Sequence, residues 1–193
     1  MREQKEFISE IREMTNVLKN NGVILYPTDT IWGLGCDATS PEAVQKIINI
    51  KKRSSEKNFI VLLDSESRLQ TYVEQVPEQA WTLIEFSEKP LTIIYEKAKN
   101  LPHELIAEDG SIAIRVTKDD FCKYLIGALR KPIVSTSANF SGQPSPASFR
   151  DIDPEIVNGV DYAANWRRRE KMNNPPSTII RLRTNGEIEF IRR

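Results

Sequence analysis

Apolar residues recur at helical spacing near the start of the chain, where one face of a helix is marked by Phe7, Ile11, Met14 and Leu18. The Asn-Asn-Gly sequence at 20–22 is typical of a helix end. A Ser-Pro-Glu sequence at 40–42 places a capping serine before a proline, so it predicts the start of a helix over 40–51. Further helical patterns lie at 67–73, 77–86 and 121–129, with a short helix opening at 153–154.

Short apolar runs alternate with these helices and are typical of buried strands. They lie at 23–26, 59–63, 91–95, 112–116 and 133–135. Near the end of the chain, segments 178–182 and 187–191 flank an Asn-Gly pair, which is a strong signal for a tight hairpin turn. Because strands and helices alternate, we expect an α/β fold. Residues 1–193 are predicted to form a single domain with a twisted, mixed open sheet flanked by helices.

Composition narrows the class of protein. The two cysteines, Cys36 and Cys122, are far apart, which excludes a disulfide framework or a cysteine-based zinc site and fits a reducing compartment. The charged N-terminus, residues 1–7, is unlike a signal peptide. No apolar run approaches the roughly 20 residues that a membrane span requires. The sequence therefore predicts a cytoplasmic protein without a membrane segment.

Charge and histidine content limit the chemistry. The 27 basic residues balance the 27 acidic ones, so no overall field attracts nucleic acid. A basic run at 167–169 favours a solvated loop. The only histidine, His103, has no nucleophile motif around it, which argues against a histidine-based catalytic triad. Any catalysis is therefore expected to depend on positioning and charge.

Three segments rich in hydroxyls, cations or small polar residues follow strand or helix ends, at 26–37, 51–57 and 135–146. Each alone has a structural explanation, as a turn, a complement to a helix C-terminus, or a Ser/Pro-rich loop. Together they supply hydroxyls, an amide and fixed cations but few general bases. That combination suits displacement at phosphorus, where catalysis is mostly positioning and charge stabilisation. The GxxxxGK[ST] motif of Walker-type ATPases is missing.

Five short motifs carry a resemblance that extends over residues 22–192. They are Tyr-Pro-Thr-Asp-Thr at 26–30, Trp-Gly-Leu-Gly at 32–35, Lys-x-Arg at 51–53, Ser-Thr-Ser-Ala-Asn at 135–139 and Pro-Ser-Thr at 176–178. In these motifs and their order the chain resembles the YrdC-like family of threonylcarbamoyl-AMP synthases. The resemblance implies a YrdC-like fold and an ATP-dependent nucleotidyltransferase. The implied reaction joins L-threonine, bicarbonate or CO2, and ATP to give threonylcarbamoyl-AMP and pyrophosphate, for tRNA modification.

The resemblance also implies roles for individual residues. The implied catalytic residues are Lys51, Arg53, Ser137 and Asn139. The implied ATP-binding residues are Lys51, Arg53, Ser111, Ser137, Asn139, Ser145 and Arg192. The implied threonine-binding residues are Thr30, Arg115, Ser135 and Ser177. Mg²⁺ is expected to accompany ATP, with no protein ligand assigned. Since Lys51 falls at the end of a predicted helix, replacing it is expected to leave the fold intact.

The implied protein partner is a tRNA-modifying threonylcarbamoyl transferase complex. A contact with tRNA or double-stranded RNA is also expected. Some segments depart from the family pattern: 87–92 lacks a glycine found in the usual Pro-Gly-Pro-Leu-Thr, and 165–175 is longer and more basic. Two alternatives stay open. One is a non-catalytic RNA-binding protein of the same fold, and the other is a relative that acts on a different carbamoyl-type substrate.

Overall fold

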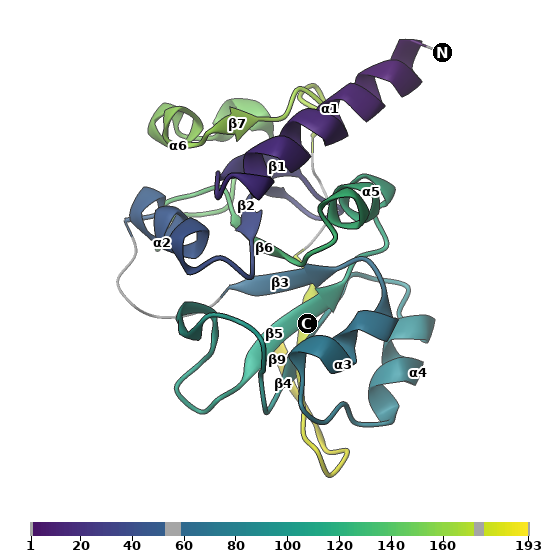
Figure 1. Ribbon diagram of the computed structural model, residues 1–193. Helices are drawn as coiled ribbons and strands as arrows, with labels where there is room; N and C mark the ends of the chain where they lie inside the picture. The colour runs from purple at the N-terminus through teal and green to yellow at the C-terminus, as the bar shows by residue number, and fades with distance from the viewer. Residues whose placement is uncertain (1, 53–58, 172–175, 193) are drawn as a thin grey trace.

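A nine-stranded mixed sheet organises the described part of the chain, which in this computed structural model comprises residues 2–52, 59–171 and 176–192. The strand order is β7-β1-β2-β6-β3-β5-β4-β8-β9 (Figure 1). The strands are β1 (Ile24–Pro27), β2 (Trp32–Asp37), β3 (Ile60–Leu63), β4 (Leu91–Tyr95), β5 (Ile112–Val116), β6 (Ile133–Ser137), β7 (Tyr162–Ala163), β8 (Thr178–Leu182) and β9 (Ile188–Arg192). Three pairs, β1–β7, β3–β5 and β4–β8, are parallel and the other five are antiparallel.

Helices lie around this sheet, so the predicted single-domain α/β fold is confirmed, while its bounds at 1 and 193 stay a prediction. The α-helices are α1 (Arg2–Lys19), α2 (Pro41–Ile50), α3 (Leu69–Tyr72), α4 (Gln79–Phe86), α5 (Asp120–Leu129) and α6 (Pro154–Gly159). Short 3₁₀ helices span Glu66–Arg68, His103–Leu105 and Phe149–Asp151. Helices α1, α2 and α5 gather around β1, β2 and β6, whereas α3 and α4 lie beside β4 and β5 (Figure 1).

Local sequence explains where these helices begin. Ser40 Oγ accepts a hydrogen bond from the backbone N–H of Ala43, 3.2 Å away, and Pro41 occupies the first helical position of α2. Asp119 caps α5 in the same way, accepting from the N–H of Cys122 at 3.0 Å. In both cases a side-chain oxygen satisfies a backbone donor that the helix itself cannot pair.

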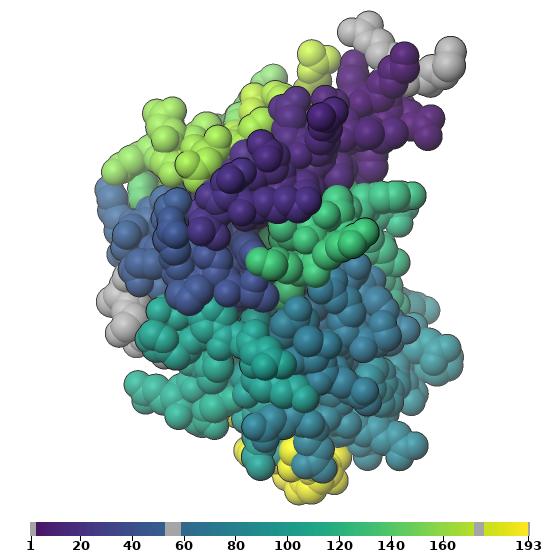
Figure 2. Space-filling view, viewed as in Figure 1, coloured from purple at the N-terminus to yellow at the C-terminus, as the bar shows by residue number. Residues whose placement is uncertain are grey.

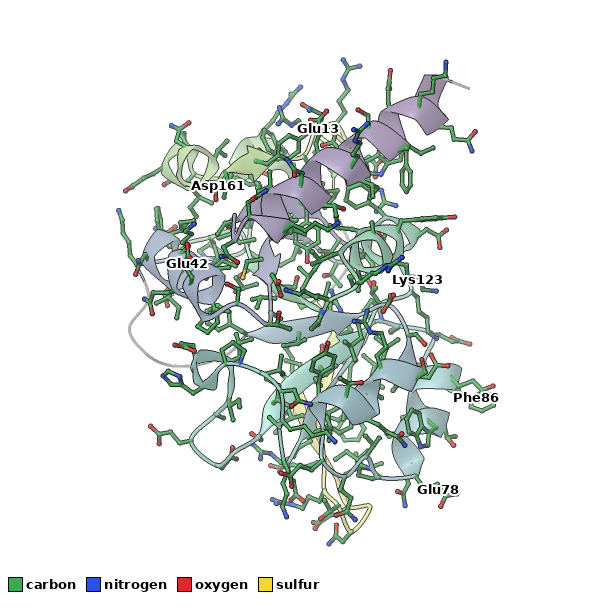
Figure 3. The ribbon with its side chains drawn as sticks, in the orientation of Figure 1. Glu13, Glu42, Glu78, Phe86, Lys123 and Asp161 are labelled. Carbon is green, nitrogen blue, oxygen red and sulfur yellow. The ribbon has the colours of Figure 1, made fainter. Side chains whose placement is uncertain are left out.

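The apolar face of α1 packs inward, as its spacing predicts, and Met14 and Leu18 are fully buried. Figure 2 shows α1 as a purple ridge across this face, above the green α5. Figure 3 shows charged side chains such as Glu13, Glu42 and Lys123 on the outer sides of α1, α2 and α5. No helix in the described ranges is both long enough and apolar enough to cross a membrane.

The segment 26–37, predicted as a loop, is a hairpin instead. Its second arm is β2, which pairs antiparallel with β1 and places Tyr26 opposite Gly33. Two glycines inside β2 hide the strand from sequence patterns, because glycine is unfavourable in strand interiors. One of them has a packing reason: an ideal Cβ on Gly35 would lie 2.7 Å from Cε1 of the buried Tyr26 ring.

We expect Gly35→Ala to lower the free energy of unfolding by about 1–3 kcal/mol, because the added methyl group forces the Tyr26 ring to move in a packed core. Urea denaturation measures the change. Gly127→Ala is the matched control, since the nearest atom to a Cβ there is 3.8 Å away and the site is in α5, where alanine is favoured by about 0.5–1 kcal/mol. Equal stability of the two variants would contradict this account of Gly35.

Two residues of the basic run at 167–169 depart from the solvated loop predicted from sequence, while Arg169 is exposed, as predicted. Arg167 Nη1 lies 2.6 Å from Asp119 Oδ2. Arg168 donates to the backbone carbonyls of Ala163 and Ala164, at 2.7 Å each, and covers the Phe149 ring at 4.4 Å. These contacts anchor the run against neighbouring elements. The predicted long segment 165–175 is described only to residue 171, so its remainder lies outside the described residues.

Candidate functional site

A cavity of about 580 Å³ draws its lining from strands across the sheet and from the loops beside them. Eight of the residues predicted as binding residues line it: Thr30, Ser111, Arg115, Ser135, Ser137, Ser145, Ser177 and Arg192. They come from segments as far apart in sequence as 30 and 192, so only the fold brings them together. Of the other predicted residues, Lys51 and Asn139 lie behind the lining and Arg53 falls outside the described residues.

Strand geometry explains why these side chains face one space. Residues two apart in a strand point to the same side of a sheet. Ser135 and Ser137 of β6 both line the cavity, and so do Ala113 and Arg115 of β5. The glycine opposite Ser137 is Gly33, which also lines the cavity and has no side chain to fill it.

The turn between β1 and β2 orders one end of the cavity. Thr28 Oγ1 donates to the carbonyl of Ile31 at 2.7 Å and accepts from the backbone N–H groups of Thr30 and Ile31. The two threonine hydroxyls lie 3.0 Å apart. Thr28 thus positions Thr30, the residue expected beside the amino-acid substrate. Sequence reasoning left Thr28 without a role, although it stands in the same Pro-Thr-Asp-Thr motif.

Arg115 is a buried cation in the cavity wall. It is 4% exposed, its Nη2 lies 3.1 Å from Asp29 Oδ1, and its Nη1 lies 3.5 Å from Thr30 Oγ1. Among the described residues, its Nε has no hydrogen-bond partner. Burial raises the pKa of the Asp29 carboxyl, and the charge of Arg115 acts in the opposite direction. An anion in the cavity would satisfy the remaining donors of this guanidinium.

Lys51 joins two of the sequence motifs. It follows the last turn of α2, is 2% exposed, and its Nζ donates to the carbonyls of Ser137 and Asn139, both at 2.6 Å. Lys51 and the strand tip after β6 therefore meet, as the resemblance requires. Lys51 does stand at a helix end, as expected, but the expectation that it lies outside the core is wrong, because the turn after α2 places its buried side chain under that strand tip.

Asn139 shapes the same strand tip from within. Its Nδ2 donates to the carbonyls of Phe140, at 3.1 Å, and Gln143, at 2.5 Å. Its Oδ1 is buried and has no hydrogen-bond partner among the described residues. Asn139 and Lys51 thus hold the backbone that presents Ser137, and their side chains stand outside the cavity wall.

Hydroxyls and an arginine form the opposite wall. Arg192 donates through Nε and Nη2 to the Ser177 carbonyl, at 3.1 and 2.8 Å. Ser177 Oγ lies 2.9 Å from Oγ1 of the fully buried Thr92. Burial lowers the pKa of Arg192, and the charge of Arg115 acts in the same direction. Two cations that repel each other across one cavity favour an anionic ligand between them.

Arg181 is a lining residue that sequence reasoning missed. It belongs to β8 and faces the cavity with Ser177 and Ile179, as the two-residue period of a strand requires. Its Nη1 lies 2.9 Å from Asp109 Oδ2. Arg181 is four residues after Ser177, so the two-residue period of a strand places both side chains on one face. The sequence alone does not say that this face of β8 borders the cavity.

The lining restricts what the cavity can do. The described lining residues include three arginines and eight serine or threonine residues, with no carboxylate, histidine or lysine. In the described part of the chain, His, Cys, Asp and Glu form no group that could hold a metal ion. Such a lining binds anions and donates hydrogen bonds, so it can stabilise negative charge on a reacting phosphate. None of the described lining residues has a side chain of the ordinary general-base type.

Known proteins are similar to this chain over most of its length. The Sua5/YciO/YrdC family model, described as "Telomere recombination", matches residues 16–193. A protein named "Threonylcarbamoyl-AMP synthase" from Pseudoalteromonas translucida is 36% identical over 177 residues, which cover 89% of this chain and 92% of the relative. A protein of the same name from Acinetobacter baumannii is 33% identical over 187 residues, covering 93% and 97%.

Solved structures give the same result. P. abyssi Sua5 complexed with L-threonine has a TM-score of 0.83 and 26% identity, and the match covers 94% of this chain. This chain spans only 53% of that protein's length. E. coli YciO has a TM-score of 0.81 and 26% identity, covering 95% of this chain and 88% of YciO. With the family model and the two relatives, these likenesses lead to one conclusion: the chain belongs to the Sua5/YciO/YrdC family.

Proposed function

We propose that this protein is an L-threonylcarbamoyladenylate synthase, which makes threonylcarbamoyl-AMP and pyrophosphate from L-threonine, bicarbonate or CO2, and ATP. One observation carries the proposal: the four residues expected to bind threonine and four of the seven expected to bind ATP (Ser111, Ser137, Ser145 and Arg192) line the same cavity of about 580 Å³. The two substrates can therefore meet. The names of the two curated relatives support the same activity.

The proposed reaction has two steps. The amino group of threonine first combines with bicarbonate, releasing water, or with CO2, releasing a proton, to give a carbamate. A carbamate oxygen then attacks the α-phosphorus of ATP while the bond from that phosphorus to the bridging oxygen breaks, and pyrophosphate leaves. Both steps gain from holding the reactants close together, and the second gains from positive charge near the phosphates.

At the amino-acid end, Arg115 binds the threonine carboxylate through two parallel hydrogen bonds, which suit a planar guanidinium. The hydroxyls of Thr30, Ser135 and Ser177 surround the remainder of the amino acid. Since no described lining residue is a usual general base, the proton lost by the threonine ammonium passes to bicarbonate or to solvent. The protein then contributes position and charge at this step.

At the nucleotide end, Ser137, Ser145 and Arg192 contact the phosphates. Lys51 and Asn139 hold the strand tip that presents Ser137, and the ammonium of Lys51 adds positive charge close behind it. The proposed role of Arg53 in neutralising the triphosphate stays a prediction, because that residue lies outside the described ranges. Charge-assisted hydrogen bonds of this kind are the strong ones in phosphate recognition.

Mg²⁺ is proposed to enter with ATP. A lining of hydroxyls without carboxylates fits a metal held mainly by phosphate oxygens and water, which is how Mg²⁺ commonly binds. When bound, the ion would neutralise part of the triphosphate charge. The hydroxyls of Ser137 and Ser145 are the described groups best suited to stand near it.

The product is a mixed anhydride, which reacts readily with nucleophiles, so a second reaction must consume it promptly. We propose that a tRNA-modifying threonylcarbamoyl transferase complex in the cytoplasm receives it, and that tRNA or double-stranded RNA contacts the protein. A purely RNA-binding role is less supported, because three arginines and eight serine or threonine residues line one cavity of about 580 Å³.

Pyrophosphate release tests the proposed function. We expect release only when ATP, L-threonine and bicarbonate are all present, since the carbamate is the group that attacks ATP. A coupled pyrophosphate assay with each substrate omitted in turn measures the dependence. Release that ignores threonine would favour a relative acting on another carbamoyl-type substrate, and RNA binding without any release would favour the non-catalytic alternative.

A further inference from the structure

Arg181 is held at the cavity wall by a carboxylate that does not itself line the cavity. Its Nη1 lies 2.9 Å from Asp109 Oδ2, and its side chain is 24% exposed. The other oxygen of that carboxylate, Asp109 Oδ1, accepts from Ser111 Oγ at 2.6 Å and from the Ser111 backbone N–H at 3.0 Å. Asp109 therefore braces two lining residues at once, one from β8 and one from the start of β5.

The ion pair between Arg181 and Asp109 contributes little to the stability of the fold. The Asp109 side chain is half exposed, and ion pairs in contact with solvent add little to folding free energy. A guanidinium has five N–H donors in a rigid fork, and Asp109 takes one of them. Because Arg181 lines the cavity, the brace leaves other donors of the fork available to a ligand there.

While its hydroxyl donates to Asp109, Ser111 cannot donate a hydrogen bond to a phosphate. The hydrogen bonds from Ser111, and then those from Arg181, hold the pKa of Asp109 down at about 2, so the carboxylate is charged near neutral pH. An ionised carboxylate only accepts hydrogen bonds, so the Ser111 hydroxyl must donate its proton to it. Ser111 can then only accept from a ligand, for example from a sugar hydroxyl. Of the two lining residues that Asp109 contacts, Arg181 is therefore the one that can donate to a phosphate.

Arg181 also supplements the positive charge of the cavity. Arg115 faces the carboxylate of Asp29, and Arg192 is tied to a neutral carbonyl. A polyphosphate carries several negative charges and has more oxygens than Arg192 alone can bind. We propose that Arg181, held in place by Asp109, is a further polyphosphate-binding residue of this cavity. The inference rests on the proposed function in naming ATP as the molecule that carries the polyphosphate.

Binding of inorganic tripolyphosphate, ATP and adenosine to the full chain tests this, measured by titration calorimetry. Arg181→Gln is expected to weaken tripolyphosphate and ATP binding about tenfold, the usual scale for one charge-assisted contact, and to leave adenosine binding unchanged. Arg183→Gln is the matched control. Arg183 lies two residues further along, forms salt bridges with Glu96, Glu187 and Glu189, and is not part of the lining. Its variant should bind all three probes within about twofold of the unaltered chain.

Arg181→Lys keeps the charge but loses the fork, so it should restore part of the lost affinity. Equal affinities for Arg181→Gln and Arg183→Gln would overturn the inference, and so would failure of the unaltered chain to bind tripolyphosphate. The tripolyphosphate arm needs no threonine and no turnover. A chain that binds it through Arg181 but releases no pyrophosphate would contradict the proposed function and leave this inference standing.

Discussion

Replacing Arg115 by glutamine is expected to raise the threonine concentration for half-maximal rate on the order of 100-fold. Each charge-assisted hydrogen bond contributes about 1.5–3 kcal/mol, and the proposed bidentate contact with the threonine carboxylate contains two. Arg115 is buried beside Thr30. The turn at 28–31 contains no lysine or arginine that could replace it. Steady-state rates at varied threonine, with ATP held constant, measure the effect. The ATP requirement should change by far less.

A control is needed because Arg115 also neutralises Asp29, 3.1 Å away. Arg115→Gln alone removes the cation that faces the half-buried Asp29 carboxylate, which costs stability. The double variant Asp29→Asn with Arg115→Gln removes that charge and should regain most of the lost stability, yet keep the high threonine requirement. If the double variant instead recovered normal threonine dependence, Arg115 would be a structural residue and its proposed substrate contact would be wrong.

Lys51→Met is expected to lower kcat on the order of 100-fold or more and to reduce stability as well. The ammonium donates to two backbone carbonyls of the strand tip, and each buried polar group left unsatisfied costs about 1–3 kcal/mol. Without this anchor, Ser137 loses its position in the cavity wall. Pyrophosphate release and urea denaturation of the same preparation separate the two effects.

The neighbouring Lys52 provides the matched control for this prediction. Its side chain is largely exposed and pairs with Glu155 at the surface, so Lys52→Met should change rate and stability only slightly. Normal turnover by Lys51→Met would remove the role assigned to that residue. If the loss of activity only matched the fraction of unfolded protein, the role of Lys51 would be structural alone.

Much of the fold could be predicted because most elements carry their own local signal. The apolar spacing of α1, the Ser40 cap of α2 and the Asn-Gly turn before β9 each depend on residues close in sequence. The hairpin of β1 and β2 could not be predicted in this way. Its second strand contains two glycines: Gly33 lines a cavity built from segments far apart in sequence, and Gly35 packs against the Tyr26 ring.

The candidate site likewise combines residues that have a local sequence signal with residues placed only by the fold. Eight of the described lining residues had been predicted as binding residues, because their hydroxyls and cations stand at or near strand ends, where ligands usually bind. What sequence could not provide was pairing across the sheet. Thr92 meets Ser177 only through the β4–β8 pairing, and Arg181 faces the cavity only because of the register of β8. The burial of Lys51 likewise depends on a strand tip 86 residues away.

The proposed reaction joins threonine, a one-carbon unit and the α-phosphate of ATP in one cavity. Its decisive test is mass spectrometry of the product formed from ¹³C-bicarbonate, L-threonine and ATP. We expect a single labelled compound that contains AMP, threonine and the bicarbonate carbon together. A product in which AMP is joined to threonine without the labelled carbon, or AMP and pyrophosphate with no adduct at any time, would contradict it.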